Sequence, residues 1–388
     1  MSIFNLMLEI LFWLSLFIIL YTYIGYACLL TLLVKLKGRK QQKLLSGWAP
    51  VTIVICAYNE EYIIEEKIKN TLQLVYPREL LTIMVVTDGS TDRTAELVRS
   101  FPGVEWSHSP ERRGKVAAVN RIMPMVKNPF VIFTDANTFL NPEAVQHIMR
   151  HYGDERVGGV AGEKRVFAGE GATAGEGVYW KYESFLKKKD AELYSVVGAA
   201  GELFSIRTAL YDFVEEDTII EDFVLSMRIC NKGYKIAYDS EAYAMETASV
   251  SIAEERKRKV RITAGAFQAM HRLGQEISFS KFPVLGFQYY SHRVLRWTLA
   301  PVALIVLFLT GTLLTVFTGN VLYATATVLQ LVFYILGILG WKLSTHKKLP
   351  KLLFVPYYFL FMNFSVFMGW KRYHKGQQSV IWEKAKRL

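Results

Sequence analysis

The stretch FTDANT, residues 133–138, ends an apolar run with two oxygen-bearing side chains, Asp135 and Asn137. The run over residues 130–134 predicts a buried strand, which would present both side chains at its C-terminal edge. Carboxylate and amide oxygens are suitable ligands for a divalent cation such as Mg²⁺ or Mn²⁺. The same residues are also typical of an Asx turn that only redirects the chain. The residues alone leave both alternatives open.

Polar residues end two earlier apolar runs in the same way. The run VTIVICAYNE closes with Ala57, Tyr58 and Glu60. The run LLTIMVVTDGSTD places Asp88 after its apolar part, where a carboxylate can accept hydrogen bonds from a ligand. Lys115 begins a helical stretch, where backbone amides and a cation could meet a phosphate. Taken singly, AYNE and Lys115 are better explained as a polar strand end and a solvated lysine.

Two further groups of charged residues lie in the second half of the chain. In TIIEDF, Glu221 and Asp222 begin a helical stretch that Gly233 ends. A carboxylate there could act as a general base, although acidic residues also favour any helix start. In ERKRKVRITAGAFQ, Arg258 and Arg261 could bind a diphosphate through their guanidinium forks. The alternative is a basic amphipathic helix lying on a membrane surface.

The elements that must position these residues alternate between strands and helices. Apolar runs at residues 51–57, 81–88 and 130–134 are separated by helical stretches near 63–74, 93–100 and 115–125. This alternation predicts an α/β fold with a mostly parallel sheet and helices on both faces. Ligands of such sheets bind outside the carboxyl ends of the strands, where the polar residues lie.

Three long blocks, residues 10–34, 297–341 and 352–370, contain no charged residue. A helix needs about 20 apolar residues to cross a bilayer, so these blocks predict membrane spans, with a break at TGN, residues 318–320. The first block lacks a preceding basic residue and a cleavage site, and we interpret it as a retained anchor. We expect an N-terminal anchor over 1–36, an α/β domain over 48–250, a basic interfacial segment over 251–296, two transmembrane helices over 297–341, and a third transmembrane or re-entrant helix over 350–372.

The net charge of +11 is concentrated beside the apolar blocks, as in Lys35, Arg39 and Lys40 or Lys347 and Lys348. The positive-inside rule then predicts a multi-pass protein of the cytoplasmic membrane with its α/β domain in the cytoplasm. Basic flanks of this kind indicate contact with membrane lipid, and no motif supports nucleic-acid binding. The three cysteines lack metal spacing and are expected to be reduced thiols.

The order of these pieces, from AYNE to the basic stretch, resembles the family 2 glycosyltransferases with the Rossmann-like GT-A fold. The membrane-bound branch that includes cellulose and hyaluronan synthases is the most similar, over about residues 50–268 and the flanking spans. Two positions depart from the family pattern. Asn137 stands where the second Asp of Asp-x-Asp is usual. In the Gln-x-x-Arg-Trp motif of processive members, Arg258 replaces Gln and Ile262 replaces Trp, while Arg261 keeps the Arg.

The resemblance implies a role for each residue. Asp222 would be the catalytic base, with Glu221 beside it, and Asp135 and Asn137 would lie at the divalent cation. The remaining positions would bind the nucleotide sugar: Ala57, Tyr58 and Glu60 at the uracil and ribose, Asp88 at the base, and Lys115, Arg258 and Arg261 at the diphosphate or sugar.

We therefore expect an inverting, metal-dependent glycosyltransferase that transfers a sugar from a nucleotide sugar, with a UDP-sugar favoured, to a lipid-linked or cell-surface glycan acceptor. A processive polysaccharide synthase is one alternative, and the missing Trp argues against it. A catalytically silent membrane partner of a glycan-synthesis complex is the other, and the retained Asp222 and Asp88 argue against that.

Overall fold

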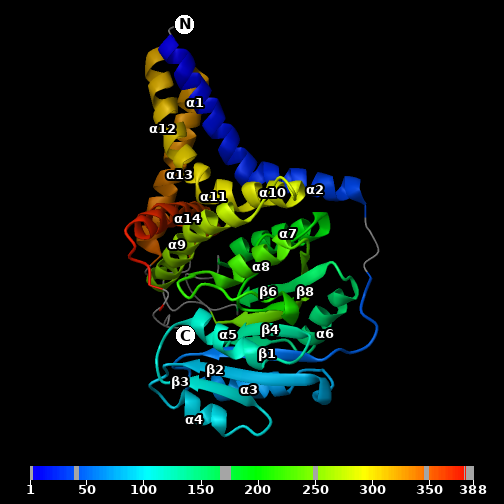
Figure 1. Ribbon diagram of the computed structural model, residues 1–388. Coiled ribbons are helices and arrows are strands. Elements are labelled where there is room, and N and C mark those ends of the chain that lie inside the picture. Colours follow the sequence, from blue (N-terminus) through cyan, green and yellow to red (C-terminus); the bar gives the residue numbers. More distant parts are fainter. Residues whose placement is uncertain are drawn as a thin grey trace.

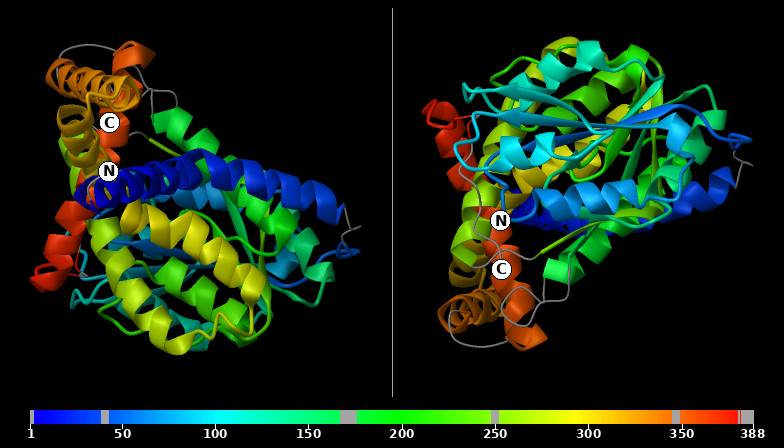
Figure 2. Two further views of the ribbon diagram at one scale, coloured as in Figure 1. Left: turned by 90° about the horizontal axis from the view of Figure 1, so that it is seen from above. Right: turned by 90° about the horizontal axis from the view of Figure 1, so that it is seen from below.

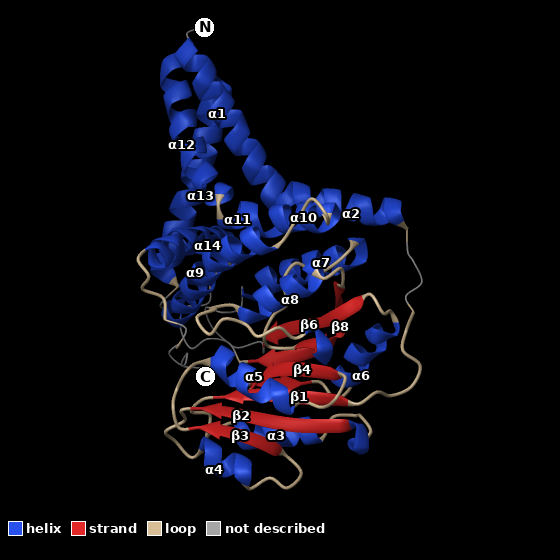
Figure 3. Cartoon of the chain, viewed as in Figure 1, coloured by secondary structure: helices blue, strands red, loops and turns tan. Residues whose placement is uncertain are grey.

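The computed structural model describes residues 3–38, 43–166, 176–247, 252–344, 349–379 and 381. Upright helices stand above a layer of roughly horizontal helices, and an α/β domain lies below them (Figure 1). Coloured by secondary structure, the strands are confined to this lower part (Figure 3). The basic residues Arg39, Lys40, Lys347 and Lys348, and the boundary expected near residue 250, fall outside the described residues.

The first half of the domain is a parallel sheet, as the alternation of strands and helices predicts. Strand β1 pairs in parallel with both β2 and β4, and β2 pairs in parallel with β3. These strands are β1 (Val51–Ala57), β2 (Leu81–Asp88), β3 (Glu105–Ser109) and β4 (Phe130–Asp135). The connecting helices are α3 (Ile64–Leu72), α4 (Thr94–Arg99) and α5 (Lys115–Ile122).

The second half extends the same sheet with mixed pairing, in the order β3-β2-β1-β4-β7-β6-β8-β5. Strand β7 is antiparallel to both β4 and β6, whereas β6 and β8 are parallel. The strands are β5 (Thr138–Leu140), β6 (Val157–Val166), β7 (Phe204–Arg207) and β8 (Lys235–Glu246). The helices are α6 (Ala144–Met149), α7 (Glu176–Leu193) and α8 (Glu221–Asn231). The expected α/β fold with a mostly parallel sheet is therefore confirmed.

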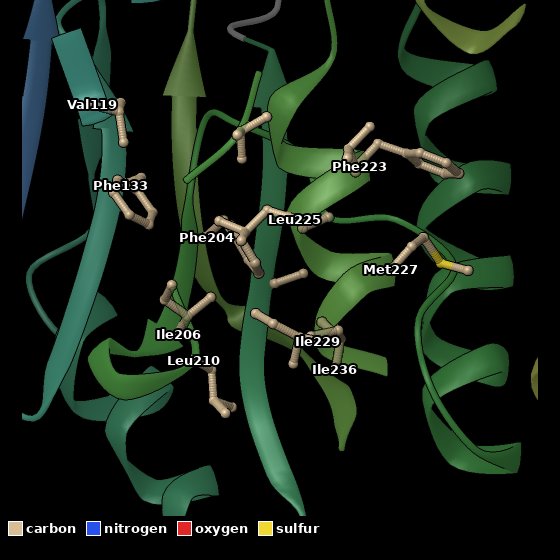
Figure 4. Close-up of a cluster of buried hydrophobic side chains, with 14 of the residues drawn as sticks. Val119, Phe133, Phe204, Ile206, Leu210, Phe223, Leu225, Met227, Ile229 and Ile236 are labelled. Atoms are coloured by element: carbon tan, nitrogen blue, oxygen red, sulfur yellow. The ribbon is translucent and has the colours of Figure 1, made fainter. Parts of the chain in front are cut away.

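Buried apolar side chains cover both faces of the sheet, and helices lie on either side of it when it is seen from below (Figure 2). On one face, α8 packs onto the strands. Leu225 of α8 lies beside Phe204 of β7, and Phe223 is on the other side of the helix (Figure 4). Because Phe223 and Leu225 are fixed in this core, the first turn of α8 is held rigidly against the strand ends.

Within the described residues, four helices are long and apolar enough to cross a membrane. The first runs from Ile3 to Lys37 with a π-helical turn at Tyr21–Gly25, where the upright α1 gives way to the horizontal α2 (Figure 1). The chain turns between α12 and α13 at Gly319, which is left-handed, and at Asn320, which caps α13. The four comprise α1 (Ile3–Leu20) with α2 (Tyr26–Lys37), α12 (Leu299–Thr318), α13 (Val321–Leu343) and α14 (Lys351–His374).

The basic segment forms a layer between these helices and the sheet. It contains α9 (Ile252–Glu276), α10 (Pro283–Tyr289) and α11 (Leu295–Trp297), with a π-helical turn at Tyr290–Val294. Helix α14 reaches from α13 down to this layer. At Gly337 and Gly340, α13 packs closely against the first half of α14. Further along α14, Gly369 packs directly against Thr263 of α9.

Substitution of Gly369 tests this packing. A Cβ atom there would lie 2.6 Å from Thr263 Cβ and 2.9 Å from Ala264 N, so Gly369→Ala must push α14 away from α9. We expect the free energy of unfolding to fall by about 1–3 kcal/mol, seen as a lower melting temperature in detergent. Gly274→Ala, on α9 with open space around it, should instead gain up to about 1 kcal/mol. Equal effects of the two changes would contradict the α9–α14 contact.

Candidate active site

The carboxyl ends of β1, β2 and β4 meet at one edge of the sheet, because these strands are parallel neighbours. A pocket opens at this edge. Seven of the residues singled out in the sequence line it: Ala57, Tyr58, Glu60, Asp88, Lys115, Asp135 and Asn137. The four remaining residues, Glu221, Asp222, Arg258 and Arg261, come from α8 and α9 and approach from the side of the horizontal helices.

An aromatic–guanidinium pair forms one wall of the pocket. The guanidinium of Arg112 lies 3.6 Å from the centre of the Tyr58 ring, a cation–π distance. The next residue, Asn59, has a φ of 53°, and its side-chain oxygen accepts a hydrogen bond from Thr91 N at 2.8 Å. This bond fixes the loop after β1 to the loop after β2. Arg112 therefore covers one face of the Tyr58 ring, and the loop that carries Tyr58 is fixed in position.

Asp88 also lines the pocket, and its two carboxylate oxygens differ in their partners. Its Oδ2 accepts hydrogen bonds from the backbone nitrogens of Arg113 at 2.9 Å and Gly114 at 2.6 Å. Its Oδ1 is buried and accepts no hydrogen bond from the described residues, although Arg121 Nη1 lies 3.6 Å away. A buried acceptor without a partner is costly, so this oxygen is suited to a donor group on a ligand.

Lys115 joins the two halves of the site. Its Nζ lies 2.8 Å from Asp135 Oδ1 and 3.0 Å from Glu221 Oε1. Burial alone lowers the pKa of Lys115, but these two carboxylates outweigh it and hold the pKa well above the usual value. The charged ammonium thus ties the end of β4 to the start of α8.

Asp222 has a raised pKa. Burial, followed by the negative charge of Glu221, raises the pKa of Asp222 to about 7, against the opposing effect of Lys115. Beneath Asp222 lies a mostly apolar cavity whose lining includes Phe133, Phe204 and Leu225. A carboxyl group with a pKa near neutrality can accept a proton at physiological pH, as a general base must.

Gly201 explains why this base remains reachable. A Cβ atom at position 201 would lie 3.0 Å from Lys115 Nζ and 3.4 Å from Asp222 Oδ2. Any side chain there would therefore crowd both charged groups. The small-residue loop before β7 leaves the space in front of Asp222 open.

The turn after β4 carries carboxylate and amide oxygens, which are the ligands that a hard cation prefers. Asp135 and Asn137 both line the pocket and supply oxygen ligands. Lys115 bonds Asp135 Oδ1, whereas Asp135 Oδ2 accepts no hydrogen bond from the residues that the structure describes. Asp135 Oδ2 is thus an oxygen ligand on the side of the pocket, and the Asn137 side chain lines the pocket beside it.

The two arginines predicted for the diphosphate lie in different surroundings. Arg261 Nη1 donates to Ile219 O at 3.4 Å, and burial lowers the pKa of Arg261 while Glu221 and Asp222 oppose this. Its charge therefore acts on the carboxylates of Glu221 and Asp222. Arg258, in contrast, has its Nη2 3.1 Å from Glu202 Oε1 and its Nη1 3.6 Å from Glu255 Oε2. Carboxylates thus offset the positive charge of Arg258, and diphosphate binding by either arginine stays a prediction.

Sequence reasoning missed two buried lysines near the site. Lys164, on β6, pairs with Glu202 at 2.6 Å and with Glu246. Lys67, on α3, lies under the turn after β4, where its Nζ donates to Thr134 Oγ1 at 3.0 Å and to Thr138 O at 2.7 Å. A lysine among charged neighbours on a helix gives no sequence signal of burial, because its partners come from distant segments.

A second cluster of possible ligands lies away from this pocket. His147, Asp239 and Glu241 bring ligand atoms within 4.8 Å of one another. Arg150 Nη2, however, lies 2.8 Å from Asp239 Oδ2 and 2.7 Å from Glu241 Oε2. The arginine neutralises this cluster, which is therefore an ion-pair network.

Comparison with known proteins agrees with this geometry. The model of the family described as Glycosyl transferase family 2 matches residues 52–213, from β1 to just beyond β7. The match to the family 2 glycosyl transferase model is confined to these residues of the α/β domain. The resemblance inferred from the sequence is thereby confirmed, and the domain is that of an enzyme family.

Relatives of this glycosyl transferase domain include two synthases. The chain is 26% identical over 235 residues to the poly-beta-1,6-N-acetyl-D-glucosamine synthase of Staphylococcus aureus (strain COL). It is 23% identical over 232 residues to the synthase of the same name from Staphylococcus epidermidis. Each match covers 57% of this chain and 56% of the relative, so the chain matches about half the length of these relatives.

A solved structure is similar over nearly the whole chain. It is described as mannosyltransferase PcManGT from Pyrobaculum calidifontis in complex with GDP-Man and Mn²⁺. The TM-score is 0.72 at 19% sequence identity, and the match covers 95% of this chain and 99% of that one. The α/β domain thus has the GT-A fold. Apolar helices precede and follow this domain in the chain.

The charge of Lys67 can be tested through the pH dependence of stability. Burial, opposed by Asp135, lowers the pKa of Lys67 from 10.5 to about 7, so the unfolded chain binds one more proton between these values. The free energy of unfolding therefore rises with pH above 7, by up to about 1.4 kcal/mol per pH unit. Below pH 7 the full cost of burying the charge applies.

Chemical unfolding at pH 6.5, 7.5 and 8.5 in detergent measures this rise. We expect Lys67→Met to lack it, and the exposed control Lys69→Met to keep it. The same slope in the wild type and in Lys67→Met would show that Lys67 does not carry a perturbed charge.

Proposed function

We propose that this protein is an inverting glycosyltransferase that moves a sugar from a nucleotide sugar to a hydroxyl group. The observation that carries the proposal is Asp222, a buried carboxyl group with its pKa raised to about 7. It lines the apolar cavity that shares Lys115 with the pocket at the strand ends. Asp222 takes the proton of the acceptor hydroxyl as that oxygen bonds to the anomeric carbon. The bond from this carbon to the diphosphate oxygen breaks, and its electron pair leaves with the nucleoside diphosphate.

The donor pocket supports a nucleotide. The Tyr58–Arg112 pair stacks the base, and Asp88 Oδ1 accepts a hydrogen bond from the base edge or the ribose. Ala57 and Glu60 complete the wall on the β1 side. A UDP-sugar remains the favoured donor, by resemblance to the family. The solved relative described with GDP-Man makes a GDP-sugar the alternative to test.

Positive charge near the diphosphate supports the step in which the nucleoside diphosphate leaves the sugar. Asp135 and Asn137 would hold a divalent cation, which neutralises the diphosphate when it is bound. Arg261 and Lys115 add fixed positive charge beside it. Glu221 holds Lys115 in place, and so acts on the site through this ammonium.

We further propose a multi-pass protein of the cytoplasmic membrane with the catalytic domain in the cytoplasm. Four apolar helices support membrane association, and the basic residues beside them support this orientation. The acceptor is then a lipid-linked or cell-surface glycan, and the product emerges next to the membrane.

A processive polysaccharide synthase is the second candidate. The names of the two staphylococcal relatives favour it. Ile262, in place of the Trp usual in processive members, argues for single transfer. Product length on a gel, with a radiolabelled donor and native lipid extract, separates the two.

Asp222→Asn tests the base. We expect the transfer rate to fall by about 10²- to 10⁴-fold, because the amide cannot accept the proton. In the wild type, kcat/KM should rise with pH through about 7, since Asp222 must lose its proton to act. Nucleotide release from protein in lipid vesicles, with a panel of UDP- and GDP-sugars, measures both effects. Asp212→Asn, a surface residue paired with Lys232, is the matched control. An active Asp222→Asn would exclude this residue as the base.

Asn137→Asp tests the metal site. Adding a carboxylate raises the negative charge of the ligand set, so the Mn²⁺ concentration for half-maximal activity should fall roughly tenfold. Activity should vanish with EDTA in both proteins and return with Mn²⁺ or Mg²⁺. An unchanged Mn²⁺ requirement in Asn137→Asp would remove Asn137 from the ligand set.

A further inference from the structure

The cavity beneath Asp222 has one charged end and one apolar end. The charged lining residues are Lys115, Glu221 and Asp222, none of which is completely buried. Six further lining residues are apolar and at most 6% exposed: Val116, Val119, Phe133, Phe204, Val214 and Leu225. The cavity therefore opens at its charged end and is closed by apolar side chains at the other.

The apolar walls come from four elements of the core. Val119 of α5 and Phe133 of β4 lie on one side of the cavity (Figure 4). Phe204 of β7 and Leu225 of α8 lie on the opposite side. Tyr211 adds its ring, because its hydroxyl already donates a hydrogen bond of 2.6 Å to an asparagine of α5. Two helices and two strands thus determine the shape of the cavity.

The volume and the lining of this cavity restrict what can enter it. Its volume is about 30 Å³. One water molecule needs roughly 10–15 Å³ of such space, so the cavity takes about two or three heavy atoms. A sugar ring or a lipid chain is too large, and water is poorly suited because apolar cavities stay dry. A short apolar group is the ligand that fits, and it would remove the cost of an unfilled cavity.

The charged end of the cavity lies next to the reacting carbon of the proposed reaction. Lys115 lines both this cavity and the donor pocket at the strand ends. A general base lies about 3 Å from the hydroxyl oxygen whose proton it takes, and this oxygen attacks the anomeric carbon from about 3 Å. The anomeric carbon and the ring carbon bonded to it then lie within roughly 8 Å of Asp222. A substituent on that second carbon can therefore reach the cavity.

We propose that the cavity receives the acyl group of an N-acylated amino sugar, carried by the carbon next to the anomeric carbon of the donor. This inference rests on the proposed function and specifies the class of sugar that is transferred. An acetamido group matches both ends of the cavity, because its amide can form hydrogen bonds at the charged end while its methyl group enters the apolar end. Val119, Phe133 and Leu225 then limit the length of the acyl chain.

The test compares donors that differ in this one substituent. The full chain in lipid nanodiscs, with Mn²⁺ and native lipid extract, receives UDP-N-acetylglucosamine, its N-butanoyl analogue, UDP-glucose or GDP-mannose. Nucleotide release gives kcat/KM for each donor. We expect kcat/KM for the acetylated donor to exceed that for UDP-glucose by about 10- to 200-fold, the usual effect of a small apolar group in its subsite. The N-butanoyl analogue should be slower than the acetylated donor, because the cavity lacks room for two more carbons.

Two substitutions of Val119 should change this selectivity in opposite directions. Val119→Ile fills the cavity and should lower the preference for the acetylated donor over UDP-glucose by about tenfold. Val119→Ala enlarges the cavity and should raise kcat/KM of the N-butanoyl analogue relative to the acetylated donor by about the same factor. Val98→Ile is the matched control, at a similarly buried valine of α4 outside the cavity, and should leave both ratios unchanged.

The melting temperature without donor is a readout that does not depend on activity. Val119→Ile should melt at the wild-type temperature or above it, because the added methylene group enters empty space. Val98→Ile should melt at a lower temperature, because it adds the same group to a filled core. A clear fall in the melting temperature of Val119→Ile would show that the space is already filled, and would overturn the proposal.

Three further results would overturn it: equal kcat/KM for the acetylated donor and UDP-glucose, faster turnover of UDP-glucose or GDP-mannose, and ratios that do not change in the Val119 variants. Failure of the proposed function is distinguishable, because no donor would then release nucleotide. Donor affinity, measured as the rise in melting temperature with donor concentration, should still favour the acetylated donor over UDP-glucose, and less so in Val119→Ile. Equal affinities of the two donors would then overturn this inference too.

Discussion

The ion pairs of Lys115 with Asp135 and Glu221 are the interaction on which the site depends. They join the end of a parallel strand to the first turn of a helix in the mixed half of the sheet. Because α8 is also fixed by Phe223 and Leu225 in the core, the ammonium and the apolar packing together determine where Asp222 lies. A donor at the strand edge and an acceptor near α8 can then meet at one carboxyl group.

The same arrangement explains why the pKa values of Asp222 and Lys67 are shifted. Asp222 lines an apolar cavity and lies beside the carboxylate of Glu221, so its pKa is raised to about 7. Lys67 donates hydrogen bonds to the turn that carries Asp135 and Asn137. Burial lowers the pKa of Lys67. Buried charge costs stability, and proteins retain it where a ligand or a reaction uses it. The concentration of such groups around one pocket is consistent with catalysis there.

The horizontal layer links this chemistry to the membrane helices. Helix α9 carries Arg261 toward Glu221 and Asp222, and it packs against α14 through Gly369. The π-helical turn at Tyr290–Val294 presents His292 and Arg293 to the carboxylates of α7. Through Tyr26, the first apolar helix joins the same network at Asp190. The active site is thus completed by segments that lie at the expected membrane surface.

The sequence by itself determined the fold class and the types of residue at the strand ends. Strand periodicity and parallel pairing are local properties, and they bring Asp88 and Asp135 to one edge in any such sheet. The order of motifs also indicated the family. Only the tertiary structure decided which charges face one another. Arg258 is neutralised by Glu202 and Glu255, whereas Arg261 faces Glu221 and Asp222, although both arginines lie one turn apart on α9. Lys187 is buried and Lys188 exposed within one basic run. The reason is physical: a charge acquires its partners and its burial from segments distant in sequence, which no local pattern records.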